Sequence, residues 1–206
     1  GLILVASQIA GETLEHYARQ IPTVVVGHHE PAALGYDTIN NDDQAGARLV
    51  VQAFLDCGYR DIAYLTQSDQ EDHLADVAPQ REMGYRKAMT AAGLADRIRV
   101  YCLPQYGQPR DEVIREILQS PDRPRAVFCW SDLDAIPLLS EAYRLGVRVP
   151  EDLAIVGYDN SPMAGLAMVD LATVDQDGPR LGKLSAEALF SRMNGRKVAE
   201  HILIEP

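Results

Sequence analysis

Short apolar runs alternate with longer amphipathic stretches along the whole chain. Most of the short runs are continuous, a pattern typical of strands buried on both faces, as in parallel sheets covered by helices. Eight runs predict strands in this way: Leu2–Ala6, Thr23–Val26, Thr38–Ile39, Ile62–Leu65, Arg99–Leu103, Ala126–Cys129, Leu153–Val156 and His201–Ile204. The pattern therefore predicts an α/β fold with parallel sheets flanked by helices.

The longer stretches place apolar residues on one face at helical spacing. They predict five helices: Asp43–Cys57, Arg81–Ala92, Asp111–Leu118, Asp132–Leu145 and Pro179–Met193. A glycine closely follows four of these stretches, which is a common helix stop. Pro137 lies about one turn inside the fourth stretch, where proline removes a backbone hydrogen bond. That helix therefore begins later than its pattern indicates, or it is bent at Pro137.

The segment from Ala126 to Asp159 carries the most information. Ser131 and Asp132 follow its first strand, and Asp159 follows its second strand. In an open parallel sheet, ligands bind at the carboxyl ends of the strands. The segment therefore predicts one βαβ unit of a small-molecule receptor.

Charge and hydropathy exclude several classes of protein. The formal net charge of the 206 residues is −11, and we find no cluster of Lys and Arg suited to phosphate groups. We therefore expect this chain not to bind nucleic acid by itself. No stretch approaches the roughly 18 continuous apolar residues of a membrane span. The three cysteines lie in apolar patterns, which predicts buried, reduced thiols in a cytoplasmic protein.

Several motifs, in order and at similar spacing, resemble one family. Examples are Ile21-Pro-Thr-Val-Val-Val-Gly27, Asn40-Asn-Asp-Asp-Gln-Ala-Gly46, Arg81-Glu-Met-Gly-Tyr-Arg86, Val149-Pro-Glu-Asp-Leu-Ala-Ile-Val-Gly-Tyr-Asp159 and Leu171-Ala-Thr-Val-Asp-Gln176. Over nearly its whole length, the chain resembles the effector-binding domain of LacI/GalR-type transcription regulators, the lactose-repressor family. The resemblance implies a two-lobed, periplasmic-binding-protein-like (type I) fold that works as a homodimer. In this family a helix-turn-helix, absent from these residues, binds operator DNA.

The resemblance also implies a division into lobes. We expect residues 1–40 to be a partial N-terminal lobe and residues 41–169 to be the C-terminal lobe. Residues 170–195 are expected to return to the N-terminal lobe, and residues 196–206 to add the last strand of the C-terminal lobe. The first lobe is then incomplete, and we expect the chain to be a fragment of a longer regulator. A sugar or related metabolite would bind in the cleft between the lobes and shift the affinity for operator DNA.

Arg81 and Asp159 are the first candidates for ligand contacts, because each matches a family residue that reaches the ligand. A guanidinium fork suits vicinal hydroxyls or a carboxylate, whereas an ionised aspartate only accepts hydrogen bonds. The two groups are expected to face one another along a shared crevice. Each has a structural alternative. Arg81 would be a surface arginine paired with Glu82 or Asp76, and Asp159 would cap the loop that begins at Asn160.

Other candidates lie at the ends of neighbouring strands. We expect Ser131 to face the ligand and Asp132 to act mainly as a helix N-cap. Trp130 and Phe128 are candidates for stacking on a sugar face, although a core role for Phe128 is equally open.

Three polar residues match family positions near the two lobe crossovers: Gln176, Asn41 and Asp42. They are candidates for hydrogen bonds to the ligand. Asn and Asp also form turns without any ligand.

We expect neither catalysis nor a metal or cofactor. His28, His29 and Glu30 are consecutive at a strand end and point in different directions, and the acidic run Asp69–Asp76 lacks the glycine spacing of a calcium loop. We find no nucleophile-elbow, Walker or dinucleotide-binding motif. Two other classes stay open: a solute-binding protein of a sugar transport system, which shares the fold, and a kinase-like or nucleoside-hydrolysing α/β enzyme.

Overall fold

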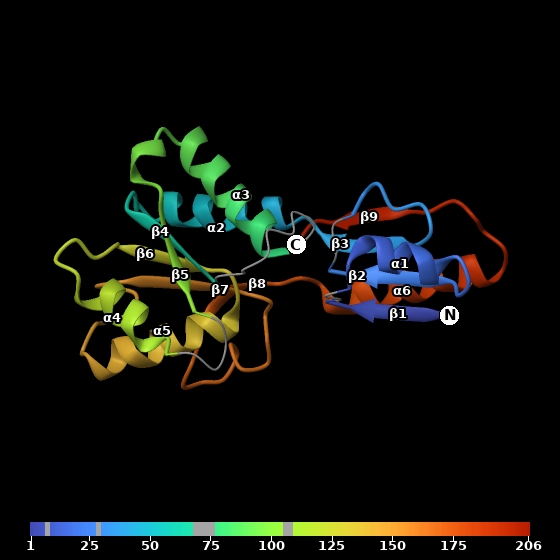
Figure 1. Ribbon diagram of the computed structural model, residues 1–206. Helices are drawn as coiled ribbons and strands as arrows, with labels where there is room; N and C mark the ends of the chain where they lie inside the picture. The colour runs from blue at the N-terminus through green and yellow to red at the C-terminus, as the bar shows by residue number, and fades with distance from the viewer. Residues whose placement is uncertain (7–8, 28–29, 68–76, 105–108) are drawn as a thin grey trace. The chain divides into compact units, whose positions relative to one another are not determined.

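The computed structural model describes residues 1–6, 9–27, 30–67, 77–104 and 109–206. Its strands form two sheets in which every described pairing is parallel. The chain divides into two compact units (Figure 1). Among the described residues, unit 1 holds 1–43, 77–80 and 176–206, and unit 2 holds 44–67 and 81–175. The predicted α/β class with parallel sheets is confirmed.

Unit 1 contains a sheet with the strand order β1-β2-β3-β9. Its strands are β1 (Leu2–Val5), β2 (Thr23–Val26), β3 (Asp37–Asn41) and β9 (His201–Ile204). Helix α1 (Gly11–Ala18) packs on one face of the sheet through Leu14, and helix α6 (Gly178–Met193) packs on the other face through Ala188. Figure 1 shows the two helices on either side of the strands. The sequence analysis did not predict α1.

Strand β9 corrects one prediction. It pairs with β3, with Thr38 opposite His201 and Asn41 opposite Ile204. Residues 201–204 therefore complete the sheet of unit 1 and do not extend the C-terminal lobe, as the sequence analysis expected. The chain also enters unit 1 at Gln176, several residues later than predicted, because a short strand precedes that point in unit 2.

Unit 2 contains a sheet with the strand order β5-β4-β6-β7-β8. Its strands are β4 (Ile62–Gln67), β5 (Arg99–Leu103), β6 (Ala126–Cys129), β7 (Ala154–Tyr158) and β8 (Ala172–Val174). Its helices are α2 (Asp43–Asp56), α3 (Val77–Ala91), α4 (Asp111–Gln119) and α5 (Asp132–Arg144), with a 3-10 turn at Ala95–Arg97. Helices α2 and α3 pack on one face of the sheet, and α4 and α5 pack on the other (Figure 1).

Two local features of unit 2 concern Pro137 and Gly46, and the first answers a question that the sequence left open. Pro137 lies inside α5, which begins at Asp132, so the helix does not start late. A glycine is required at position 46 because a Cβ there would come within 2.1 Å of the Tyr158 hydroxyl and 2.8 Å of its ring. Helix α2 can therefore lie close to β7 only with glycine at this position.

The cysteines differ from their prediction. All three are free, but only Cys129 is buried, whereas Cys57 and Cys102 are exposed. Cys102 lies on β5, an edge strand on which alternate side chains face away from the core, and Cys57 follows the last residue of α2. Burial raises the pKa of the Cys129 thiol well above its usual value, which keeps this thiol protonated and unreactive.

Among the helices of the described residues, we find none whose length and apolar content would let it cross a membrane.

Candidate functional site

Arg81 is buried in α3, with 3% of its surface exposed. Its Nη1 donates a hydrogen bond to the backbone carbonyl oxygen of Trp130 at 2.5 Å and lies 3.4 Å from Oδ1 of Asp159. The guanidinium carbon is 3.6 Å from the centroid of the Tyr158 ring, where the ring face attracts a cation. The prediction that Arg81 and Asp159 lie face to face is confirmed. Glu82, the surface partner considered for Arg81, pairs with Arg86 at 2.7 Å, and Asp76 lies outside the described residues.

Asp159 stands at the carboxyl end of β7 in an unusual conformation. Its φ is +115°, in a region that residues other than glycine rarely adopt. Its backbone N–H bonds to the carbonyl oxygen of Val174, and about a third of its side chain (32%) is exposed. Residues held in such conformations cluster at binding and catalytic sites, where the surrounding structure imposes them. The carboxylate is thus held beside Arg81 and remains accessible to solvent.

Ser131, and not Asp132, is the N-cap of α5, while Asp132 keeps the structural role that the sequence predicted through other bonds. Ser131 is the N-cap of α5: its Oγ accepts from the Asp134 N–H at 3.3 Å and donates to Asp134 Oδ2 at 2.9 Å. Asp132, which was expected to be the N-cap, accepts from the Ser161 N–H at 2.7 Å and from the Thr173 hydroxyl at 2.6 Å. The buried hydroxyl of Ser131 is therefore used within the protein, and its contact with a ligand stays a prediction.

The two aromatic candidates lie in different surroundings. Phe128 is fully buried between Tyr64 and Tyr158, with ring centroids 5.1 and 6.3 Å away. Its burial supports the core role that the sequence left open. Trp130 is half-buried, directly beyond the end of β6, and its ring centroid is 5.9 Å from the guanidinium carbon of Arg81. Trp130 therefore stays a candidate for the ligand contact.

The three crossover residues belong to unit 1. The side-chain amide of Asn41 donates to the backbone carbonyl oxygen of Gln176 at 2.8 Å. The backbone N–H of Asp42 donates to Ile204 at 2.8 Å. These bonds join the end of β3 to Gln176 and to β9 within unit 1. A ligand contact by Asn41, Asp42 or Gln176 stays a prediction.

Three residues of the site were missed by the sequence analysis. Tyr158 forms the aromatic floor beneath Arg81, and Asp134 and Arg110 form a buried ion pair at 2.5 Å beside Trp130. The spacing Ser131-x-x-Asp134 is a capping-box signal and could have identified Asp134. No local pattern identifies Arg110, because its partner lies 24 residues away.

The chemistry of this arrangement is that of binding. One guanidinium and one carboxylate meet on an aromatic floor at the carboxyl ends of β6 and β7. The two groups place a donor beside an acceptor, and the half-buried Trp130 adds apolar surface next to them, a combination suited to a polar ligand. Within the described residues, no three His, Cys, Asp or Glu side chains come together to hold a metal ion. His28, His29 and the acidic run Asp69–Asp76 lie outside those residues.

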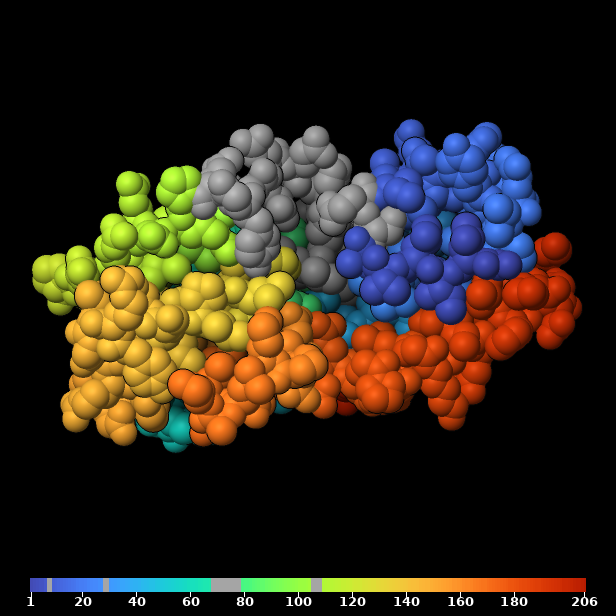
Figure 2. Space-filling view, turned by 90° about the horizontal axis from the view of Figure 1, so that it is seen from below, coloured from blue at the N-terminus to red at the C-terminus, as the bar shows by residue number. Residues whose placement is uncertain are grey.

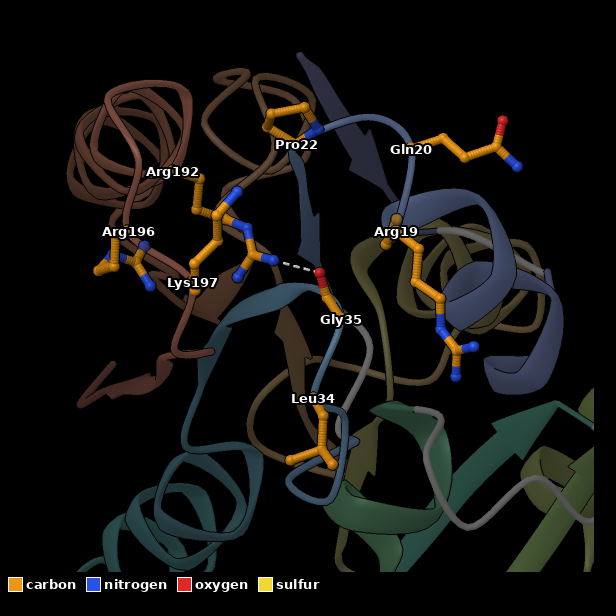
Figure 3. A pocket seen from close by; sticks show the side chains of 9 residues that line it. Arg19, Gln20, Pro22, Leu34, Gly35, Arg192, Arg196 and Lys197 are labelled. Atoms are coloured by element: carbon orange, nitrogen blue, oxygen red, sulfur yellow. Dashed lines mark hydrogen bonds between the residues drawn. The ribbon is translucent and has the colours of Figure 1, made fainter.

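Unit 1 has a pocket of about 270 Å³ near the end of α6, lined by several cationic side chains. Figure 3 shows that Arg192 donates to the Gly35 carbonyl oxygen, while the side chains of Arg19 and Gln20 point away from that bond. Arg192 also binds the buried carboxylate of Asp37 at 2.7 Å. Arg192 of this pocket thus joins α6 to β3.

Asp37 is the centre of this ion cluster. Its two oxygens accept hydrogen bonds from Arg192, Arg196 and the Glu200 N–H. Burial by itself would raise the pKa of Asp37, but hydrogen bonds from Arg196, Glu200 and Arg192 outweigh it and lower the pKa below its ordinary value. The cluster is therefore a structural tie within unit 1.

The sequence of the chain is similar to those of known proteins. The family described as the periplasmic binding protein-like domain has a sequence model that matches residues 51–206 of this chain. The HTH-type transcriptional repressor PurR of Photobacterium profundum is 29% identical over 95% of this chain and 58% of its own length. The ribose operon repressor of Haemophilus influenzae is 29% identical over 100% of this chain and 61% of its own length. The chain spans about three fifths of the length of these relatives.

A solved structure shares the fold. The crystal structure of a LacI transcriptional regulator from a Rhodococcus species superimposes with a TM-score of 0.89 and 26% sequence identity. The match covers 99% of this chain and 74% of that chain.

Proposed function

The chain belongs to the family of periplasmic binding protein-like domains, and from this premise we propose that it is the effector-sensing core of a LacI-type transcription regulator. The resemblance to LacI-type regulators indicated by the sequence is confirmed, since similar proteins are repressors and a LacI regulator has the same fold. These relatives favour a regulator over a transport protein, and none of those cited is named as an enzyme.

The observation that carries the proposal is the pairing of Arg81 with Asp159 at the carboxyl ends of the strands of unit 2. The arginine supplies a charged donor, the accessible carboxylate supplies an acceptor, and the half-buried Trp130 supplies apolar ring surface. The buried ring of Tyr158 supports Arg81 from beneath. A sugar offers hydroxyl groups that both donate and accept, together with an apolar C–H face. We therefore propose a sugar or related polar metabolite as the effector. Binding in a cleft between the lobes stays a prediction from the sequence.

Regulation by such an effector follows from differential binding. A small molecule shifts an equilibrium between two states of a regulator only if it binds them with different affinity. Moving a balance from 1:99 to 99:1 takes roughly 5.5 kcal/mol. Several hydrogen bonds to charged groups, at about 1.5–3 kcal/mol each, are enough if they form in one state only.

Asp159→Asn is expected to weaken effector binding by about 10- to 100-fold, because it removes the charge from one hydrogen bond worth about 1.5–3 kcal/mol. Asparagine tolerates a positive φ, so the backbone at this position should hold. The effector is first found by a thermal-shift screen of pentoses, hexoses, their sugar acids and nucleobases. Isothermal titration calorimetry of the best compound then compares wild type with the variant.

The matched control is Asp122→Asn, which removes the same charge from a side chain that is 94% exposed. It should bind the compound like wild type. A compound that binds Asp159→Asn and Arg81→Lys with undiminished affinity would remove this site from the proposal while leaving the fold untouched.

We propose that operator DNA is bound by a part of the regulator outside these 206 residues. Support comes from the net charge of −11, which opposes binding to phosphates, and from the greater length of the repressors that the chain matches. A gel-shift experiment with the full-length regulator and its own promoter, with and without the effector, tests whether the longer protein binds operator DNA and responds to the effector.

We further propose a homodimer that uses the turn after Asp159. Within this turn Met163, Leu166 and Met168 are exposed, with Met168 at 92%. The turn, orange in Figure 2, lies on the surface of unit 2. Exposed apolar side chains gathered in one segment are typical of protein contact sites. Met168→Glu is therefore expected to shift the dimer toward monomer in sedimentation-velocity experiments.

Leu49→Glu serves as the control, since Leu49 is also exposed but lies on α2, away from this turn in the sequence. It should leave the sedimentation coefficient unchanged. A wild-type protein that stays monomeric at high concentration would contradict the dimer, and a dimer insensitive to Met168→Glu would place its interface elsewhere.

A further inference from the structure

Asp134 is a fully buried carboxylate with an unusual set of partners. Its Oδ2 accepts hydrogen bonds from the indole Nε1–H of Trp130 and from the hydroxyl of Ser131 at 2.9 Å. Its Oδ1 accepts from Arg110 Nη2 at 2.5 Å, and Arg110 itself is largely buried. Asp134 therefore joins the start of α5, the residue before α4 and the indole of Trp130.

Trp130 is held at both its backbone and its ring. Its N–H donates to Leu65 of β4 at 2.9 Å, and its carbonyl oxygen accepts from Arg81. A tryptophan side chain has two rotatable bonds, so a hydrogen bond at Nε1 to a fixed acceptor fixes the plane of the ring. Trp130 thus keeps one orientation beside Arg81 while remaining half-buried.

Stability alone gives little reason for this network. Taking a carboxylate and a guanidinium out of water costs several kcal/mol per ion, and apolar residues of similar volume often replace such a pair without loss. A buried ionic network does, however, fix a single arrangement of the groups that it joins. The group fixed here is an aromatic ring next to the arginine of the candidate site.

We propose that Asp134, supported by Arg110 and Ser131, is a positioning residue of the effector site that holds the Trp130 indole as a wall of that site. This inference rests on the proposed function. The indole N–H is used within the protein, so the wall offers only the face and apolar edge of the ring. The side of the effector that meets Trp130 is therefore apolar, such as the C–H face of a sugar ring. The polar groups of the effector bind to Arg81 and Asp159.

The chain contains a single tryptophan, so its fluorescence reports on Trp130 alone. The probe is acrylamide, a neutral quencher that measures access to the ring. Asp134→Asn and Arg110→Gln should raise the quenching rate constant and add a fast component to the anisotropy decay of Trp130. Asp122→Asn, the exposed control, should leave both values unchanged. Unchanged quenching and anisotropy in both Asp134→Asn and Arg110→Gln would overturn the positioning role.

The second arm measures binding of the best compound from the sugar and nucleobase screen by calorimetry. Asp134→Asn should lose about tenfold in affinity, comparable to the loss of one aromatic contact. Trp130→Phe keeps a ring but lacks the N–H that Asp134 holds, so it should lose affinity about as Asp134→Asn does, whereas Trp130→Ala should lose more. Unchanged affinity in an Asp134→Asn protein with a mobilised indole would overturn the proposal and leave the effector site at Arg81 and Asp159 intact. If no compound binds wild type, the proposed function fails, while the quenching result still decides whether Asp134 holds the ring.

Discussion

Asp37→Ala is expected to lower the free energy of unfolding by about 3–5 kcal/mol, the usual cost of removing one partner from a buried ion cluster. The substitution leaves Arg192, whose side chain is 8% exposed, and Arg196, at 17%, without their common carboxylate. It also leaves the N–H of Glu200 without its acceptor. Urea denaturation followed by circular dichroism measures the change. Glu187→Ala on the exposed side of α6 is the control and should change the free energy by less than about 0.5 kcal/mol.

The pH dependence gives an independent test of the same cluster. Folding lowers the pKa of Asp37, so its contribution is fully present above the unfolded pKa of about 3.9 and is lost as the pH falls through the folded pKa. The difference in unfolding free energy between wild type and Asp37→Asn should therefore be constant near neutral pH. It should shrink as the pH falls below about 4. A difference that is small at neutral pH, or that grows on acidification, would contradict the role given to the Asp37 carboxylate.

Gly46→Val is expected to destabilise the protein by about 1–3 kcal/mol through overpacking and also to abolish effector binding. The added side chain would meet the ring of Tyr158, which is fully buried and cannot move away freely. Because Tyr158 lies 3.6 Å beneath the guanidinium of Arg81, any shift of the ring displaces the arginine from Asp159. Thermal unfolding and calorimetric titration with the effector measure the two effects.

A paired substitution separates this mechanism from general damage. The nearest atom to the added Cβ is the Tyr158 hydroxyl oxygen, so Gly46→Ala should be better tolerated in a Tyr158→Phe background than in wild type. Gly182→Ala is the control, because Gly182 also lies in a helix and a Cβ at this position meets no atom within 4 Å. If Gly46→Val binds the effector as wild type does, the contact between α2 and Tyr158 does not support the site.

The sequence predicted the elements with strong patterns and missed those with weak ones. The valine run of β2 and the continuous apolar run of β6 were placed at their observed bounds. Helix α1 was missed because it buries only Leu14 and Ala18, too few apolar positions to form a visible stripe. Strand β8 was missed because it has three residues and lies at a sheet edge. Hydrophobic periodicity detects burial, and these elements bury little.

Pairing partners are harder to predict than the elements themselves. The run His201–Ile204 identified a strand, but nothing within it shows which of the two sheets it joins. The site illustrates the same limit. The meeting of Arg81 and Asp159 followed from the order of parallel strands together with the family resemblance. The buried carboxylate of Asp134 also pairs with Arg110, which lies 24 residues away, just before α4. Local spacing does not encode such a contact.

The discontinuous course of the chain through unit 1 has a consequence for its synthesis. Strand β3 leaves the ribosome long before its neighbour β9 exists, and the bond between Asn41 and Gln176 spans 135 residues. At about 5–20 residues per second, this interval lasts roughly 10 to 30 seconds. During that time one side of β3 has no partner strand, while the intervening residues can already close the other sheet. The unpaired side of β3 is, for that interval, an open strand edge of the kind through which chains aggregate.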